Sequence, residues 1–243
     1  VQDFDASKLN FGAVSNGNLF NINLSTEGIN YTHVNGLNYI PSLNQIVLNS
    51  RVLNEFLIID HDLSTQQAAS NIGGRYNKGG EILYRWGNPM NYTSGTPMDQ
   101  QLHEHHDTSF VGNNSLSRGT FLVFDNQDGP DFSTVKEIHI NVSPDGVYEM
   151  LPSSGNSPAN PIWSYSSEEI YSQRTSGTQR LPSGNTLITS TTGNIIREVN
   201  YANEILWEFN TAIEVNGVLE IDSSGFKSRS YEKDYLGVIA LGL

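Results

Sequence analysis

The chain's candidate reactive groups are its histidines. The sequence contains six histidines and no cysteine. A neutral imidazole can act as a nucleophile, and the imidazole–imidazolium pair can exchange protons near pH 7. A chain without cysteine has no thiolate nucleophile, no disulfide framework and no Cys-ligated metal. Any covalent or acid–base chemistry is therefore expected to begin at a histidine.

The densest group of histidines spans residues 103–106, with the sequence His-Glu-His-His. On a strand, His103 and His105 would lie on one face and could form a metal pair. Two ligands without an evident third are weak evidence for zinc, and the string lacks the HExxH spacing of metalloproteases. We predict no metal site here. His61, between two aspartates, and His139, in an alternating run, are expected to face solvent.

A second polar group follows the apolar run that ends at Phe124. Asp125, Asn126, Asp128 and Asp131 offer oxygen ligands at short spacing. Calcium accepts such ligands, but the twelve-residue EF-hand pattern is absent and a hydrogen-bonded turn explains the residues equally well. No cofactor is predicted, and calcium stays open as an alternative.

Composition and missing motifs exclude several classes of function. A net charge of −13 repels phosphate backbones, so nucleic acid is not an expected partner. No run of about 18 apolar residues is present, so no membrane span is expected. A GxSxG elbow, a phosphate-binding loop and a GxGxxG fingerprint are all absent. Such acidity suits a chain that works outside the cytoplasm.

Short β-type runs dominate the chain, and helical periodicity is nearly absent. The best helix candidate is Leu63–Ser70. Two stretches rich in Gly, Asn, Ser and His, residues 61–80 and 88–117, are expected to be inserted loops. The predicted strands are Gln45–Asn49, Phe56–Asp60, Gly119–Asp125, Lys136–Val142, Thr186–Ser190 and Ile195–Asn200.

These runs form a loose repeat. A turn-plus-strand element starts near Leu43, Arg118 and Ser183, and a strand bearing tryptophan closes each unit. A large aromatic at one repeat position fills the wedge between two propeller blades. The three tryptophans, all expected in the core, are Trp86, Trp163 and Trp207.

The predicted fold class is all-β, a β-propeller of which residues 1–243 form part of a single domain. About three blades are evident, with partial strands at Leu19–Leu24 and Val218–Ile221. A complete ring is expected to have six blades, so a protein partner or further chain would complete it. Val1 is not a natural start, and an N-terminal portion is expected to be missing.

Several segments of the sequence are distinctive. The longest runs from Asn71 to Pro89, with the sequence NIGGRYNKGGEILYRWGNP. Others are Thr32–Tyr39 leading to Leu48–Arg51, His105–Asp107 followed by Phe124–Gly129, and Arg229–Tyr235. In order over roughly residues 30–240, these segments resemble bacterial arylsulfotransferase-like propellers. The resemblance implies an exported six-bladed propeller, periplasmic, extracellular or on the cell surface. It would transfer a sulfuryl group from an aryl sulfate to a phenol through a sulfohistidine, without a nucleotide donor.

The same resemblance assigns roles to particular residues. His33 and His106 match two of the family's histidines and would be catalytic. Arg51 is a candidate anion binder, because a guanidinium matches sulfate oxygens well. The predicted substrate-binding residues are Arg51, Arg75, Tyr76, Lys78 and Asn126.

The catalytic set is incomplete in this alignment. Gln179 stands where the family's nucleophilic histidine is expected, and no histidine follows His139. Pro130 stands near the position of the family's catalytic arginine. Three alternatives remain: His33 or His106 is the nucleophile, the alignment register is wrong, or the propeller is inactive and serves as an exported binding or structural module.

Overall fold

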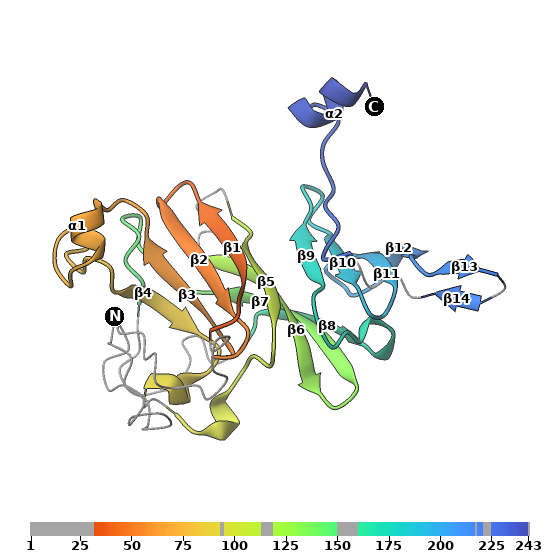
Figure 1. Ribbon diagram of the computed structural model, residues 1–243, viewed down its shortest axis with the longest axis horizontal. Helices are drawn as coiled ribbons and strands as arrows, with labels where there is room; N and C mark the ends of the chain where they lie inside the picture. Colours follow the sequence, from red (N-terminus) through yellow and green to blue (C-terminus); the bar gives the residue numbers. More distant parts are fainter. Residues whose placement is uncertain are drawn as a thin grey trace.

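The chain folds into three consecutive four-stranded antiparallel sheets, each a simple meander (Figure 1). The computed structural model describes residues 32–92, 95–112, 119–149, 160–216, 218–220 and 225–242. The first blade contains β1 (Val34–Ile40), β2 (Gln45–Ser50), β3 (Glu55–Asp60) and β4 (Ile82–Trp86). The second contains β5 (His106–Phe110), β6 (Thr120–Gly129), β7 (Phe132–His139) and β8 (Trp163–Ser167). The third contains β9 (Gly177–Arg180), β10 (Thr186–Ser190), β11 (Ile195–Val199) and β12 (Ile205–Asn210).

The first strands of neighbouring blades, β1, β5 and β9, contact one another, as the inner strands of a propeller do around its axis. This arrangement confirms the predicted all-β class and its blades. The predicted partial strand at Leu19–Leu24 lies outside the described residues. The one at Val218–Ile221 is part of a separate hairpin, β13 (Ile213–Val215) with β14 (Val218–Glu220), and not of a blade.

Asparagine sets the hairpin turns. The loops between β1 and β2, between β2 and β3, and between β10 and β11 each end on an asparagine with positive φ: Asn44, Asn54 and Asn194. Asparagine tolerates this left-handed conformation better than most residues, because its side chain can hydrogen-bond locally. The high asparagine content therefore has a structural use in joining the blade strands.

The helices are short. α1 (Thr65–Ala68) occupies only part of the predicted Leu63–Ser70 helix, and Ser64 caps it. α2 (Leu236–Leu241) projects away from the blades near the C-terminal end (Figure 1). None of the described helices reaches the length of a bilayer span. Single 3₁₀ turns cover Pro89–Tyr92, Pro97–Asp99 and Glu168–Ile170.

Apolar side chains fill the wedges between the blades. In the first wedge Phe56 packs on Trp86 and on Phe121, with ring centroids 6.0 and 5.3 Å apart. The second wedge is built around Phe124 and Trp163. Trp86, Trp163 and Trp207 each lie on the fourth strand of a blade, as the repeat predicts.

The expectation that all three tryptophans are buried is wrong for Trp207, which is 44% exposed. All six residues of β12 are exposed. β12 is the edge strand of the third blade, and no described segment covers it.

The prediction for residues 88–117 also needs correction, because β5 lies inside that supposed insertion. The 61–80 insertion is real, and it carries α1 between β3 and β4.

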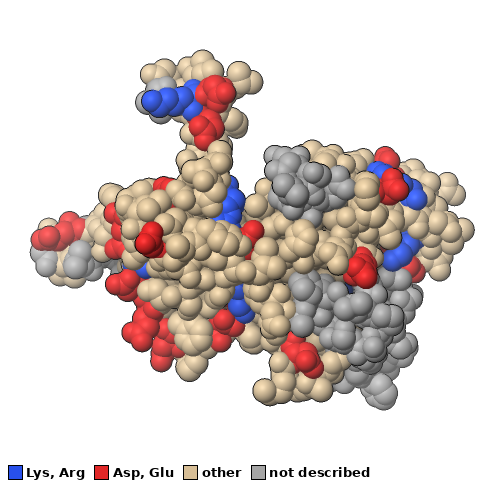
Figure 2. All heavy atoms as spheres, turned by 180° about the vertical axis from the view of Figure 1, so that it is seen from behind, with Lys and Arg blue, Asp and Glu red and all other residues tan. Residues whose placement is uncertain are grey.

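On the face seen in Figure 2, acidic side chains gather over the third blade.

Candidate functional site

The strand register identifies equivalent positions on the inner strands. Ser109 pairs with Leu122 in the second blade, and Gln179 pairs with Leu187 in the third. Since Leu122 and Leu187 occupy the same place in the repeat, Gln179 is the counterpart of Ser109. β5 contains a bulge between His106 and Ser109, whereas β9 is regular. His106 pairs with Phe124, and the residue equivalent to Phe124, Thr189, pairs with Gly177. Gly177 is therefore the counterpart of His106.

On β9 the position equivalent to His106 lies two residues before Gln179. The third blade carries glycine, Gly177, at this place. The side chain of Gln179 binds the backbone of Ser230: its Oε1 accepts from the N–H at 2.8 Å and its Nε2 donates to the carbonyl at 2.9 Å.

Residues 226–230 occupy the place of a fourth inner strand. Asn38 on β1 accepts a hydrogen bond from the backbone N–H of Phe110 on the next inner strand, at 3.1 Å. Gln179, at the equivalent position, accepts from Ser230 in the same way. The N–H of Ser176 also donates to the carbonyl of Phe226 at 3.0 Å. The C-terminal segment therefore continues the ring of inner strands beyond β9.

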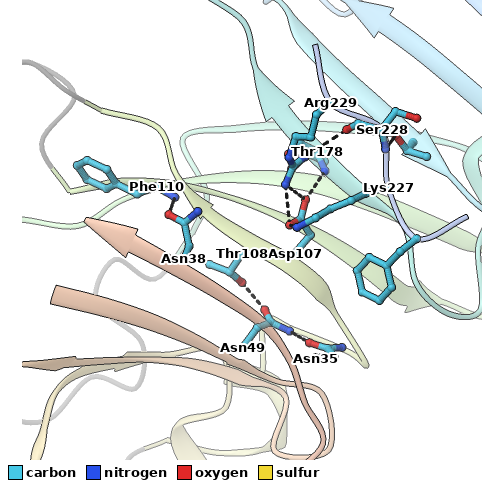
Figure 3. A network of polar contacts seen from close by, with 12 residues as sticks. Asn35, Asn38, Asn49, Asp107, Thr108, Phe110, Thr178, Lys227, Ser228 and Arg229 are labelled. Carbon is cyan, nitrogen blue, oxygen red and sulfur yellow. Dashed lines mark hydrogen bonds and ion pairs between the residues drawn. The ribbon is translucent and has the colours of Figure 1, made fainter. Parts of the chain in front are cut away.

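Asp107 joins this segment to the second and third blades (Figure 3). Its side chain is 4% exposed, and its carboxylate accepts two hydrogen bonds of 2.9 Å from Nη2 of Arg229. It also pairs with Lys227 and accepts the backbone N–H of Thr178 at 3.0 Å. One buried carboxylate thus faces two cations, which leaves an excess of positive charge beside the inner strands.

A small polar pocket of about 190 Å³ lies between the inner strands. Asn38, Ser109, Gln179 and Arg229, which share one register position on the four inner segments, all line it. The pocket lies about 10 Å along β5 from His106, at about 3.3 Å per residue. The inner strands and the 226–230 segment therefore line a polar pocket with a guanidinium in its wall.

His106 is buried and held through both ring nitrogens. Nδ1 lies 2.7 Å from Oδ1 of Asn126 and 3.1 Å from the carbonyl of Glu104, and both of these atoms are acceptors. Nδ1 therefore carries the proton. Nε2 then accepts the backbone N–H of Thr175 at 3.2 Å. Burial lowers the pKa of His106 to about 4, so the ring is neutral at pH 7 with its lone pair on Nε2.

The orientation of Asn126 is fixed independently of His106. Its Nδ2 donates to the carbonyls of Ser172 and Thr175, at 2.9 and 3.0 Å. Its oxygen must therefore face Nδ1 of His106. Asn126 therefore selects the tautomer of His106. The sequence-based prediction gave Asn126 a role in substrate binding and did not include this one.

His33 and Arg51 lie close to His106. His33 immediately precedes β1, and its carbonyl accepts the backbone N–H of Arg51, which follows β2. The charges of Arg51 and His33 both act to lower the pKa of His106, though less than burial does. The guanidinium of Arg51 pairs with Glu104, whose carbonyl bonds His106. Four of the predicted residues, His33, Arg51, His106 and Asn126, are thus brought together.

The other three predicted residues lie elsewhere. Arg75, Tyr76 and Lys78 line a separate pocket beside the start of β2, where Tyr76 contacts Gln45 at 2.9 Å. Arg51 follows the other end of β2. Six residues of strand separate the two places by about 20 Å.

Of the residues named as metal ligands, His103, Asp125 and Asp128 place their ligand atoms within 4.8 Å of one another, and His105 is not in this group. His105 is fully buried and burial holds its pKa well below the usual range, whereas His103 lies 3.4 Å from Asp125. The two rings therefore do not form a pair. Nζ of Lys136 lies 2.7 Å from both Asp125 and Asp128, so an ammonium sits between the two carboxylates named for calcium.

His103 should make stability depend on pH. Its hydrogen bonds with Asp125 and Asp128 raise the pKa to about 9 in the folded chain, from 6.5. The protonated ring therefore stabilises the fold fully below pH 6.5, and this contribution is lost as pH rises through 9. Because the side chain is 35% exposed, we expect only about 1 kcal/mol after screening. Urea unfolding at pH 6 and pH 9.5 should show a gap between wild type and His103→Gln that closes at high pH; a constant gap would contradict the assignment.

Gly177, next to Ser176, leaves room for Asp107. A Cβ at Gly177 would lie 2.4 Å from Oδ2 of Asp107. Since two cations fix that carboxylate, Gly177→Ala should lower the free energy of unfolding by about 1–3 kcal/mol. Gly225→Ala is the control, because nothing lies within 4 Å of its Cβ. Equal stability of the two variants, measured by urea unfolding, would refute the close approach.

Comparison with known proteins supplies the family. A model of the family described as Arylsulfotransferase (ASST) matches residues 2–223. Among curated proteins no match is found. Solved structures similar to the chain include a streptogramin B lyase, at 13% identity and a TM-score of 0.33 over 75% of this chain and 42% of that one. Another is a protein of unknown function from Bacteroides caccae, at 11% identity and a TM-score of 0.31 over 73% and 60%. The chain spans less than two thirds of either structure.

The family model covers most of the chain, from the residues before the first blade to the hairpin after the third. This protein therefore belongs to the arylsulfotransferase family.

Proposed function

We propose that the chain carries a sulfuryl-transfer site in which Nε2 of His106 accepts the sulfuryl group of an aryl sulfate. The observation that carries this proposal is the locked tautomer of His106, a neutral ring whose Nδ1–H is bound to Asn126 and whose Nε2 holds a lone pair. A nucleophile needs that lone pair at neutral pH. In the free protein the backbone N–H of Thr175 donates to Nε2 at 3.2 Å. When substrate binds, this N–H would donate to a sulfonate oxygen instead and leave Nε2 available for attack.

The two steps balance in atoms and charge. Nε2 attacks sulfur, the S–O bond to the aryl group breaks, and the phenolate leaves with the electron pair and takes a proton from a proton carrier. The oxygen of the acceptor phenol then attacks the sulfur of the sulfohistidine and gives its proton back to that carrier. The N–S bond breaks, and its electron pair returns to Nε2. His33 is the candidate proton carrier, because it lies close enough to His106 to influence its pKa.

Positive charge near the site would hold the sulfonate. Arg51 lies at the His106 end, and Lys227 and Arg229 add a net positive charge around Asp107. Preorganised cations and N–H groups stabilise developing oxyanion charge in a partly buried site. Lys227 and Arg229 were not found from sequence, since they lie 120 residues or more along the chain from Asp107.

The test is release of 4-nitrophenol from 4-nitrophenyl sulfate, with and without added phenol. Phenol-dependent release by the purified chain is the expected result. Heat-unfolded chain at the same concentration is the control for spontaneous hydrolysis. Absence of release at high protein concentration would refute the proposal.

A second candidate is a binding module that has lost the chemistry. The register favours it in one respect: the position of the third blade equivalent to His106 holds Gly177. Glycine has no side chain that could accept a sulfuryl group. Saturable binding of 4-nitrophenyl sulfate without any release of 4-nitrophenol would support this alternative.

A further inference from the structure

A second pocket, of about 250 Å³, lies between the β3–β4 insertion and the turn that follows β7. Arg75, Tyr76 and Lys78 come from the insertion, and Val147 and Tyr148 come from the turn. The pocket lies at the opposite end of β2 from Arg51. It is therefore separate from the site around His106.

The floor of this pocket is built around Gln45, which is fully buried at the start of β2. Its Nε2 donates to Oη of Tyr76 at 2.9 Å and to the carbonyl of Gly146 at 3.1 Å. Its Oε1 accepts from Oη of Tyr148 at 2.6 Å. One amide thus fixes two tyrosines from distant parts of the chain, so the aromatic wall is ordered before any ligand binds.

The turn is shaped to meet this wall. Gly146 has a φ of +83°, and a Cβ there would lie 2.4 Å from Oη of Tyr76. Only glycine combines this backbone conformation with so close an approach. The contact between turn and insertion is therefore a specific one.

The pocket carries positive charge inside a strongly acidic protein. Its described lining includes the cations Arg75 and Lys78 and no carboxylate. Arg75 pairs with Asp145 at 3.7 Å, and that carboxylate is 87% exposed, so solvent screens the pair well. Desolvation lowers the pKa of Lys78, and the charge of the nearby Glu81 opposes this shift. An anion in the pocket would add a second charge interaction for Arg75 and for Lys78.

We propose that this pocket binds a small aromatic anion, a single ring bearing a carboxylate or sulfonate. The ring would lie against Leu83, Val147 and Tyr148, and the anionic group would meet Arg75 and Lys78. An apolar cavity of about 150 Å³ holds benzene, so about 250 Å³ accommodates a ring with its substituent. This inference does not depend on sulfuryl transfer at His106.

The test is calorimetric titration of the full chain with benzenesulfonate, which cannot donate a sulfuryl group. The double variant Arg75→Gln/Lys78→Gln should bind about 10-fold more weakly or worse, because two charge-assisted hydrogen bonds are lost. Val147→Trp should block the pocket; Val147 is 58% exposed, so this change spares the core. Lys233→Gln is the control, because Lys233 is exposed and lies outside both sites, and it should retain the binding. Arg51→Gln is titrated in parallel to detect binding at the His106 site.

Two outcomes would overturn the proposal. One is binding that survives both pocket variants and is lost only in Arg51→Gln, which would move the ligand to the His106 site. The other is equal binding of benzylamine, a cationic ring of similar size, which would remove the role of charge. Absence of turnover in the 4-nitrophenyl sulfate assay would leave this inference untouched.

Discussion

Replacing His106 with alanine is expected to lower phenol-dependent release of 4-nitrophenol by at least about 10³-fold, the order seen when a nucleophile or an oxyanion donor is removed. The reason is geometric. His106 is buried, Asn126 binds its Nδ1, and its Nε2 keeps a lone pair. Without His106, Arg51 and the C-terminal cations could still bind the aryl sulfate, but no nucleophile would be present to accept its sulfuryl group.

His61→Ala is the matched control. His61 is exposed, and its ring bonds Asn44 at 3.0 Å in the turn between β1 and β2. The His61→Ala substitution should therefore leave the rate of 4-nitrophenol release unchanged. A fully active His106→Ala variant would remove His106 from the mechanism and turn attention to His33.

The pH profile gives an independent check on the same residue. Because burial lowers the pKa of His106 to about 4, Nε2 keeps its lone pair down to that pH. The acid limb of kcat/KM for the free protein should therefore fall near pH 4. An acid limb near pH 6.5, the ordinary value for histidine, would indicate that an exposed histidine does the work.

The blades could be predicted from sequence because their signal is local. Short alternating runs and asparagine turns predict hairpins, and the tryptophans mark the fourth strands. β5 was missed because its sequence, His-Asp-Thr-Ser-Phe, is polar and lacks alternation. What makes it a strand is its pairing with β6 across a bulge, a long-range contact that leaves no local pattern.

The site was predictable only in part, for similar reasons. Four site residues could be picked out because their side chains are of types that bind anions, transfer protons or form hydrogen bonds: His33, Arg51, His106 and Asn126. The group that donates to Nε2 is the backbone N–H of Thr175. Every residue except proline has such a group, so the residue type at position 175 gives no signal. The equivalence of Gly177 with His106 depends on the bulge between His106 and Ser109, which adds one residue to β5 and shifts any count made along the sequence.

Replacing Asp107 with alanine is expected to lower the free energy of unfolding by about 3–5 kcal/mol, the range for breaking one side of a buried ion pair. Three donors depend on this carboxylate: Lys227, Arg229 and the N–H of Thr178. Without it, two cations remain together with no counter-ion, and the 226–230 segment loses its strongest link to the blades. Urea unfolding gives the stability.

Asp145→Ala is the control for removing a carboxylate from a cation. Its pair with Arg75 is exposed, so the expected change is below about 0.5 kcal/mol. Asp107→Asn should fall between the two variants, because the amide oxygen can still accept the Thr178 N–H. Limited proteolysis should cut the 225–230 region faster in Asp107→Ala than in wild type. A loss under about 1 kcal/mol together with unchanged proteolysis would show that Gln179 and Ser176 suffice to hold the fourth inner segment, and that the charge around Asp107 serves ligand binding alone.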